Sequence, residues 1–244
     1  MKLGIISDIH GNLEALETVL KKLERLNVDE VICLGDIVGY GANPNECCEL
    51  VREHCSVVVL GNHDEWALHP PDRGVVGANV WQSILWTANA LDESHRQYFA
   101  SLPLIRHRGN LIFVHAAPVE PQRWDYITNQ TSAMKYFPYV AEKICFVGHS
   151  HLPGIYYIDD LQHNVTETSD FMQVNAAGKG AIINIGSVGQ PRDGNATSSF
   201  CVYDSDVIPP AKIIRLGYDV KVAGEKIINV GLPRFFAVRL EKGF

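Results

Sequence analysis

Short apolar runs alternate with longer amphipathic segments over the first quarter of the chain. The apolar runs are rich in β-branched residues and predict strands at 2–6, 31–34 and 56–60. Segment 12–26 places leucine at every third or fourth position and predicts a helix, and Asn43-Pro44 predicts the start of a second helix that runs to His54. Near-continuous apolar strands separated by helices indicate parallel strands that are buried on both faces.

The pattern changes at residue 65. Segment 65–106 contains three tryptophans, is helical in pattern from about 78 to 99, and is longer than a simple crossover requires. We interpret it as a helical insertion near the ends of the strands. Strands are then expected at 111–114 and 144–147, with a helix near 131–142 between them.

The last third of the chain consists of short apolar segments separated by turn residues. These segments predict strands, paired mostly antiparallel, at 155–158, 171–174, 181–185, 199–203, 211–215 and 235–240. Because no internal repeat, low-complexity tract or Gly/Ser linker interrupts the sequence, we expect residues 1–244 to form a single domain.

The composition and charge of the chain bear on which binding partners are expected. The 244 residues are 46% hydrophobic and carry a net charge of −7, with no cluster of Lys and Arg. We therefore expect no binding to nucleic-acid duplexes or to anionic membrane surfaces. The six cysteines form no metal-binding C-x-x-C spacing and predict reduced thiols in a cytoplasmic protein. Nothing in the sequence predicts an oligomeric state.

Polar residues capable of binding metals follow five of the predicted strands. They are Asp8 and His10, Asp36, Asn62 and His63, His115, and His149 and His151. In open α/β sheets, ligands bind beyond the carboxyl ends of the strands, so we expect these side chains to lie close together. Residues i and i+2 of an extended segment point the same way, so the pairs 8/10 and 149/151 are each expected to converge.

Each of these residues alone has a simpler interpretation. Asp36 and Asn62 are common in turns and caps, and His115 is typical of a partly buried imidazole. The whole set is harder to explain without a cation, because desolvated carboxylates and imidazoles without partners are costly. The joint pattern therefore indicates a metal site.

The motifs D-x-H (8–10), G-D-x-x-G (35–39), G-N-H-D (61–64), His115 and G-H-x-H (148–151) follow one another in order. In this order they resemble the motif set of the calcineurin-like metallophosphoesterases. The segment NIGSVGQPRDGN (184–195) further resembles a loop of a small bacterial and archaeal branch with diadenosine-tetraphosphatase-like and phosphodiesterase-like members. That loop usually has proline where Ile185 stands here.

The resemblance implies an α/β fold in four layers, with two mixed sheets packed face to face between helices. It also implies two divalent metal ions, with Mn, Fe and Zn all compatible with the ligand types. One ion would be held by Asp8, His10, Asp36 and His151. The other would be held by Asp36, Asn62, His115 and His149, so that Asp36 bridges the two.

By the same resemblance, a hydroxide bridging the two metals would attack a phosphomonoester or phosphodiester. His63 would stabilise the transferring phosphoryl group or protonate the leaving oxygen, with Asp64 as a candidate to orient it. Arg192 is a candidate to bind substrate phosphate, or else a solvated loop residue.

Three further questions stay open at this point. The expected partner is a small phosphorylated molecule, and nucleotide diesters, dinucleoside polyphosphates, sugar phosphates and phosphoproteins are all candidate substrates. Trp124 and Tyr126 are interpreted either as core residues or as stacking partners for a base. The alternative to an enzyme is a non-catalytic scaffold that keeps this fold, although all seven ligand positions and His63 are present here.

Overall fold

The computed structural model describes residues 1–158, 164–167, 180–207 and 210–244, and in them the strands form two mixed sheets. The first sheet has the order β11-β10-β1-β2-β3. Its members are β1 (Lys2–Ile6), β2 (Glu30–Cys33), β3 (Cys55–Val58), β10 (Ser198–Asp204) and β11 (Ala211–Leu216). Strands β1, β2 and β3 run parallel, as the alternation of apolar runs and helices predicts, whereas β10 pairs antiparallel with both of its neighbours.

The second sheet has the order β4-β5-β6-β9-β7-β8. Its members are β4 (Ile105–Arg108), β5 (Leu111–Val114), β6 (Ile144–Val147), β7 (Gly154–Ile158), β8 (Asn164–Glu167) and β9 (Ala181–Asn184). Strands β5, β6 and β9 are parallel, and the remaining pairs are antiparallel. The predicted strand at 171–174 lies outside the described residues.

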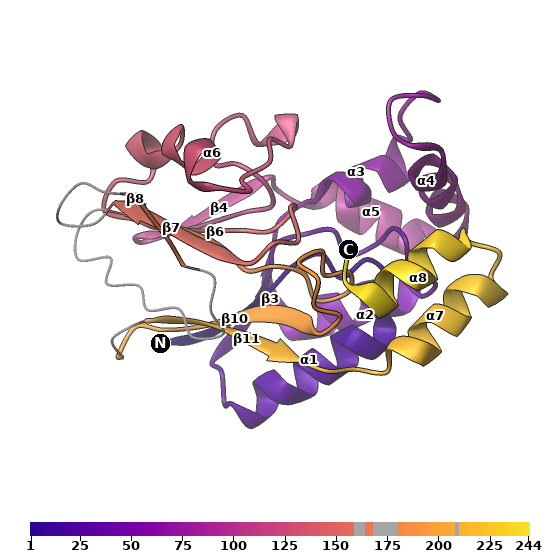
Figure 1. Ribbon diagram of the computed structural model, residues 1–244, viewed down its shortest axis with the longest axis horizontal. Coiled ribbons are helices and arrows are strands. Elements are labelled where there is room, and N and C mark those ends of the chain that lie inside the picture. The colour runs from indigo at the N-terminus through magenta and orange to yellow at the C-terminus, as the bar shows by residue number, and fades with distance from the viewer. Residues whose placement is uncertain (159–163, 168–179, 208–209) are drawn as a thin grey trace.

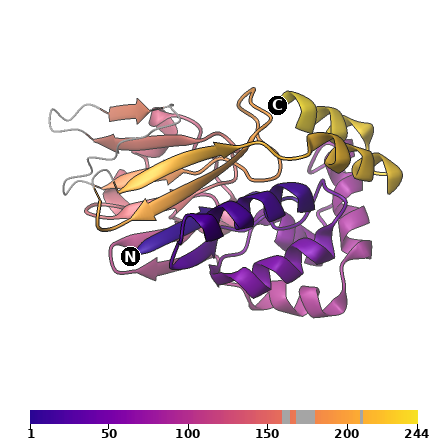
Figure 2. The same cartoon turned by 90° about the horizontal axis from the view of Figure 1, so that it is seen from below.

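Successive side chains along each strand point to opposite faces of the sheet, so each sheet packs against a different layer on either side. Leu3 and Ile5 of β1 pack with Phe113 and Phe146 of the second sheet, forming an apolar core between the two sheets. Ile6 points to the opposite face of the first sheet, which is covered by α1 (Leu13–Arg25) and α2 (Pro44–His54). Figures 1 and 2 show the two sheets between their helices. The four-layer α/β sandwich is therefore confirmed.

The outer face of the second sheet has a core of its own. Apolar side chains of β5, β6 and β9 pack there against α6 (Gln130–Met134) and the 3-10 turn Phe137–Tyr139. A further 3-10 turn spans Pro121–Arg123. The single helix expected near 131–142 is thus two shorter pieces.

The insertion is helical but interrupted. Its helices are α3 (Asn62–Leu68), which begins before residue 65, α4 (Ala78–Ala90) and α5 (Glu93–Ser101), and the end of the predicted range belongs to strand β4. The Asn45 side chain explains why α4 and α5 are separate, because its amide donates to Ala90 O and its oxygen accepts from Asp92 N. A residue of α2 thereby satisfies backbone groups at the break that a continuous helix would have paired internally.

The C-terminal prediction of a strand at 235–240 is wrong. Residues Arg234–Lys242 form α8, which packs on α7 (Val220–Asn229). Phe236, Ala237 and Leu240 are buried at helical spacing, and Gly243 ends the helix with a φ of 68°. The helical pair lies beside the insertion helices at one end of the sheets (Figures 1 and 2).

Cys33, Cys145 and Cys201 are buried core residues, and all six cysteines are free thiols in the structure. In the part of the chain that the structure describes, no helix has both the length and the apolar character needed to span a bilayer.

Candidate metal centre

The seven side chains predicted as metal ligands gather at one end of the parallel strands, where each is 5% exposed or less. They form two neighbouring clusters, one around Asp8, His10 and His151 and the other around Asp36, His115 and His149, and His63 forms a third close group with His10 and Asp36, one residue from each cluster. Asn62 belongs to the second cluster, because its Oδ1 lies 3.2 Å from His115 Nε2. The parallel arrangement of β1, β2, β3, β5 and β6 is what brings these strand ends together.

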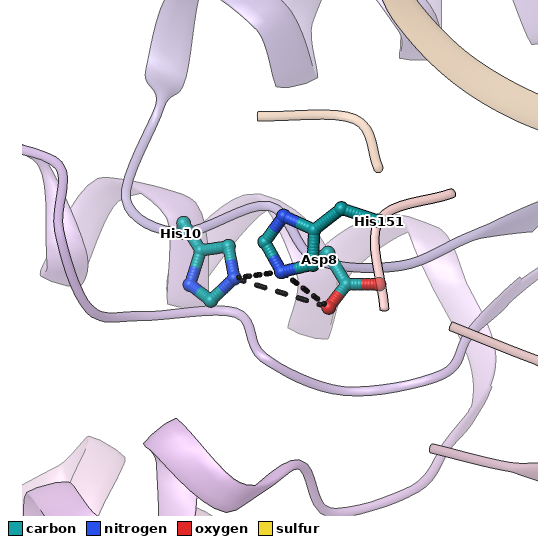
Figure 3. Close-up of side chains that lie close together, drawn as sticks. All are labelled: Asp8, His10 and His151. Carbon is teal, nitrogen blue, oxygen red and sulfur yellow. Dashed lines mark hydrogen bonds and ion pairs between the residues drawn. The ribbon is translucent and has the colours of Figure 1, made fainter. Parts of the chain in front are cut away.

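In the first cluster the donor atoms face a common point (Figure 3). His151 Nε2 lies 3.2 Å from Asp8 Oδ1, and His10 Nε2 lies 3.8 Å from the same oxygen. The two Nε2 atoms are 3.1 Å apart. Three buried donor atoms thus lie within reach of a single cation.

Asp36 joins the two clusters. Its Oδ2 lies 3.6 Å from His10 Nε2 and 3.3 Å from His115 Nε2, while its Oδ1 accepts from His63 N. Burial acts to raise the pKa of Asp36, but the imidazoles of His115, His63 and His10 outweigh it and hold the pKa well below its usual range. The charged carboxylate is therefore favoured at the centre of the site.

The hydrogen bonds of the histidine Nδ1 atoms, which point away from the centre, show whether the Nε2 atoms are free to bind a metal. The Nδ1 atoms of His10, His115 and His151 each face a backbone oxygen, namely those of Val38, Leu34 and Gln190. A carbonyl only accepts, so each Nδ1 carries a proton. Burial lowers the pKa of His10 and of His151, so these two rings are neutral and their Nε2 atoms offer lone pairs to the centre. Lone pairs of His10 and His151 would then face each other, and such a contact is favourable only with a cation between them.

Two further properties of the histidines also fit a bound cation. The Nε2 of His149 is buried without a hydrogen-bond partner among the described residues. The pKa of His115 is raised to about 9, because attraction by Asp36 outweighs the lowering effect of burial. The site therefore attracts positive charge, and its imidazole, carboxylate and carboxamide donors fit a divalent transition metal.

The candidate ligands come together through a backbone conformation that differs from the extended one expected for the pairs 8/10 and 149/151. Asp8, His10, Asp36, His149 and His151 all have positive φ, between 51° and 64°. Left-handed backbone is uncommon for residues other than glycine and costs roughly 1–3 kcal/mol per residue. The pairs 8/10 and 149/151 are therefore turned rather than extended, and His149 and His151 face different clusters.

Glycine is required next to two of the ligands. A Cβ on Gly148 would overlap Asp8 Oδ2 and Ser7 Oγ, and one on Gly61 would overlap Asp36 Oδ1. The G-H-x-H and G-N-H-D motifs thus depend on glycine because a carboxylate from another strand packs directly on the backbone.

Asp64 holds the site together in a way that the sequence did not indicate. Its Oδ1 accepts from Ile37 N and Val38 N, and its Oδ2 accepts from Gly61 N. These bonds tie the loop of Asp36 to the loop of Asn62. The predicted contact that would orient His63 is not among them, and His63 Nδ1 has no hydrogen-bond partner among the described residues.

His63 lies in the wall of a cavity of about 300 Å³ beside the clusters. Its ring packs against Tyr40 at 4.4 Å and Trp66 at 5.0 Å between centroids. Burial lowers the pKa of His63 to about 4. A Cβ on Gly39 would lie 2.6 Å from Nδ1, so this nitrogen faces the backbone and Nε2 remains for the cavity.

The cavity is also lined by residues from the helical insertion, from the loop that carries Tyr126 and from the C-terminal helix α8. Arg192 and Tyr126 line it, and Tyr126 stacks on His149 at 4.0 Å. Tyr126 is 54% exposed and is therefore not a core residue. Trp124 instead donates to Glu65. Tyr40 and Arg239 line the cavity without having been predicted. In the sequence, Pro233 and Gly243 could have indicated the start and the end of the helix that carries Arg239.

The amino-acid sequence is similar to those of known proteins. The profile of the calcineurin-like phosphoesterase superfamily domain matches residues 1–207. The uncharacterized protein MJ0912 of Methanocaldococcus jannaschii is 38% identical over 251 residues, which cover 99% of this chain and 98% of that protein. Phosphodiesterase YfcE of Escherichia coli strain K12 is 30% identical over 140 residues, covering 50% of this chain and 73% of that enzyme.

Structural comparison agrees. The crystal structure of a metallophosphoesterase from Sphaerobacter thermophilus superimposes with a TM-score of 0.89 at 35% sequence identity, and the match covers 100% of this chain and 99% of that one. The similarity therefore includes the C-terminal helices that lie outside the matched family domain.

Proposed function

From the premise that the chain belongs to the calcineurin-like phosphoesterase superfamily and is a metal-dependent phosphoesterase, we propose that it holds two divalent ions and hydrolyses an ester of a small, nucleotide-type phosphate. The observation that carries this proposal is the opposition of ring nitrogens at His10 and His151, 3.1 Å apart with both Nδ1 atoms facing carbonyls. A cavity of about 300 Å³ suits a small molecule.

Each metal would take the ligands of one cluster. Asp8, His10 and His151 would hold one ion, and Asn62, His115 and His149 the other, with Asp36 shared. Two such ions supply a nucleophile at neutral pH and stabilise charge on the phosphoryl oxygens. They also supply local positive potential on a chain whose net charge is −7.

His63 is proposed to assist the leaving group. Its backbone N–H is bound to Asp36, which fixes the residue beside the centre, and its ring lines the cavity. An N–H at Nε2 can donate to the departing oxygen. Arg192 is proposed to bind a phosphoryl oxygen, since its guanidinium lines the same cavity as His63 and His151.

The test is metal content combined with turnover. Protein loaded with Mn²⁺ should contain close to two ions per chain and should hydrolyse bis-p-nitrophenyl phosphate. Asp36→Ala should weaken both sites together, whereas His151→Ala should empty chiefly one. Elemental analysis that shows full occupancy in the Asp36 variant would remove the shared role from this residue.

A further inference from the structure

Arg239 brings a second guanidinium into the cavity from a helix beyond the matched family domain. It belongs to α8, whereas the family profile ends at residue 207. Arg239 lines the same cavity as Arg192, Asn62 and His149. The C-terminal helices therefore contribute to the site itself as well as to packing.

One glutamine holds the two arginines side by side. Gln190 Oε1 accepts from Arg192 Nη2 at 2.9 Å and from Arg239 Nη1 at 3.2 Å. Gln190 is itself 1% exposed, and its backbone N–H is bound to Ser187 Oγ. Two cations that share a single buried acceptor are thus fixed next to each other.

Neither charge is neutralised within the described residues. No carboxylate there lies within 4.0 Å of either guanidinium, and Asp193, the neighbour of Arg192, is paired with Arg215 at 2.9 Å. The Nε atoms of Arg192 and Arg239 are both buried without a hydrogen-bond partner. Burial and the charge of Arg192 lower the pKa of Arg239, so an anion bound here would relieve an unfavourable arrangement.

The two arginines lie at different depths. The backbone N–H of Arg192 contacts His151 O at 3.4 Å, and its charge acts on both His63 and His151. The charged and titratable neighbours of Arg239 are Arg192, Tyr40 and Tyr126. Arg192 is therefore next to the metal ligands, and Arg239 is one step farther out.

Packing fixes α8 in this position. Phe236 is fully buried and contacts the ring of Tyr40 at 4.8 Å between centroids. Gly194 N, in the loop of Arg192, donates to Gly243 O at the end of α8. The helix and the loop are thus attached to each other, and so are the arginines that they carry.

We propose that Arg239 binds a second phosphate group adjacent to the reacting one, so that the substrate contains a diphosphate unit. The inference rests on the proposed function, with Arg192 at the reacting phosphoryl group. Guanidinium groups pair with phosphate oxygens through parallel N–H bonds, and two adjacent guanidiniums match two adjacent phosphates. The cavity size favours a nucleoside polyphosphate or similar small molecule over a phosphoprotein.

The probes are methylenediphosphonate, a diphosphate that is not hydrolysed, and methylphosphonate, which has one phosphorus. Affinities are measured by calorimetry on manganese-loaded protein in manganese-saturated buffer. Wild-type protein should prefer the diphosphonate. Arg239→Gln should weaken the diphosphonate at least about tenfold, which corresponds to about 1.4 kcal/mol, and change the phosphonate less than about twofold. Arg239→Lys should restore part of the loss.

Arg234→Ala is the matched control, because Arg234 is exposed at the start of the same helix and does not line the cavity. It should leave both affinities unchanged. Equal diphosphonate affinity in wild type and Arg239→Gln, or an equal loss for both probes, would overturn the inference. Binding does not require turnover, so failure to hydrolyse bis-p-nitrophenyl phosphate would count against the proposed function alone.

Discussion

The carboxylate of Asp64 accepts a hydrogen bond from the backbone N–H of Ile37 at 2.8 Å, across 27 positions of sequence. Its other oxygen accepts from Gly61 N at 3.1 Å. One buried side chain thereby connects the loop of Asp36, which we propose as the shared ligand, to the loop of Asn62.

Asp64→Ala should lose both stability and metal. The substitution leaves the buried amides of Ile37, Val38 and Gly61 without an acceptor, and each costs roughly 1–3 kcal/mol. We expect the free energy of unfolding to fall by at least about 2 kcal/mol in denaturant titrations, with metal content reduced and Asp64→Asn intermediate. Wild-type stability and metal content with lost activity would instead support the catalytic role predicted from the sequence.

His63→Asn should keep the metals and lose activity according to the leaving group. A proton donor contributes about 10²–10⁴-fold and matters most for leaving oxygens of high pKa. The variant should therefore lose much of its rate on alkyl or nucleoside phosphates and less on p-nitrophenyl esters. A loss that is the same across a leaving-group series would indicate stabilisation of the phosphoryl group instead. Loss of metal would mean that the ligand in Gly61-Asn62-His63-Asp64 had been misidentified.

Arg192→Ala should raise KM or lower kcat/KM without altering metal content. The guanidinium lines the cavity and is held by Gln190 rather than by a metal ligand side chain. Removal of a charge-assisted bond to phosphate is expected to cost about 1.5–3 kcal/mol, or roughly tenfold or more in kcat/KM. Unchanged kcat/KM on both a monoester and a diester would return Arg192 to the solvated-loop interpretation.

Gly148→Ala should disrupt the first cluster. The added methyl group would overlap Asp8 Oδ2 and Ser7 Oγ, and both side chains are fully buried, with both Asp8 oxygens bound to His149 N. We expect loss of roughly 1–3 kcal/mol of stability and of metal from the Asp8 site. Gly217→Ala is the control, since nothing lies within 4 Å of its added Cβ. Full metal occupancy in Gly148→Ala would contradict the required close approach.

The Glu30–Arg108 pair predicts a pH-dependent link between the sheets. Arg108 of β4 donates to Glu30 of β2 at 2.7 Å, and the bonds from Arg108 and Ser56 lower the pKa of Glu30 below its ordinary 4.5. A lowered carboxylate pKa stabilises the fold above pH 4.5, and that contribution is lost as the pH falls through the folded-state value.

Arg108→Gln should therefore cost about 0.2–1 kcal/mol at pH 7, and the difference from wild type should shrink toward pH 3. Denaturant titrations at several pH values measure it. Arg106→Gln is the control, because Arg106 is also exposed on the same strand and forms no ion pair with the residues that the structure describes. A difference that stays constant from pH 7 to pH 3 would show that the pair contributes through packing rather than charge.

Sequence by itself determined the elements whose pattern is local. The parallel strands β1, β2, β3, β5 and β6 follow from short apolar runs, because strands buried on both faces must be apolar throughout. The gathering of the polar residues at one site follows from their position at the ends of those strands, since the fold class fixes where such ends meet. Their division into two ligand sets was implied by the family resemblance. The motif order also led to the correct family.

Only the tertiary structure decided the features that depend on contacts between distant segments. The apolar pattern of residues 235–240, FFAVRL, is compatible with either a strand or a helix. The segment is a helix because its apolar side chains pack on α7 and Tyr40. Asp64 became a backbone acceptor because Ile37 and Gly61 meet it from other loops. Arg239 entered the cavity because α8 docks on the loop of Arg192. Local periodicity carries no information about such pairings, which arise when burial and hydrogen bonding are satisfied across the whole chain.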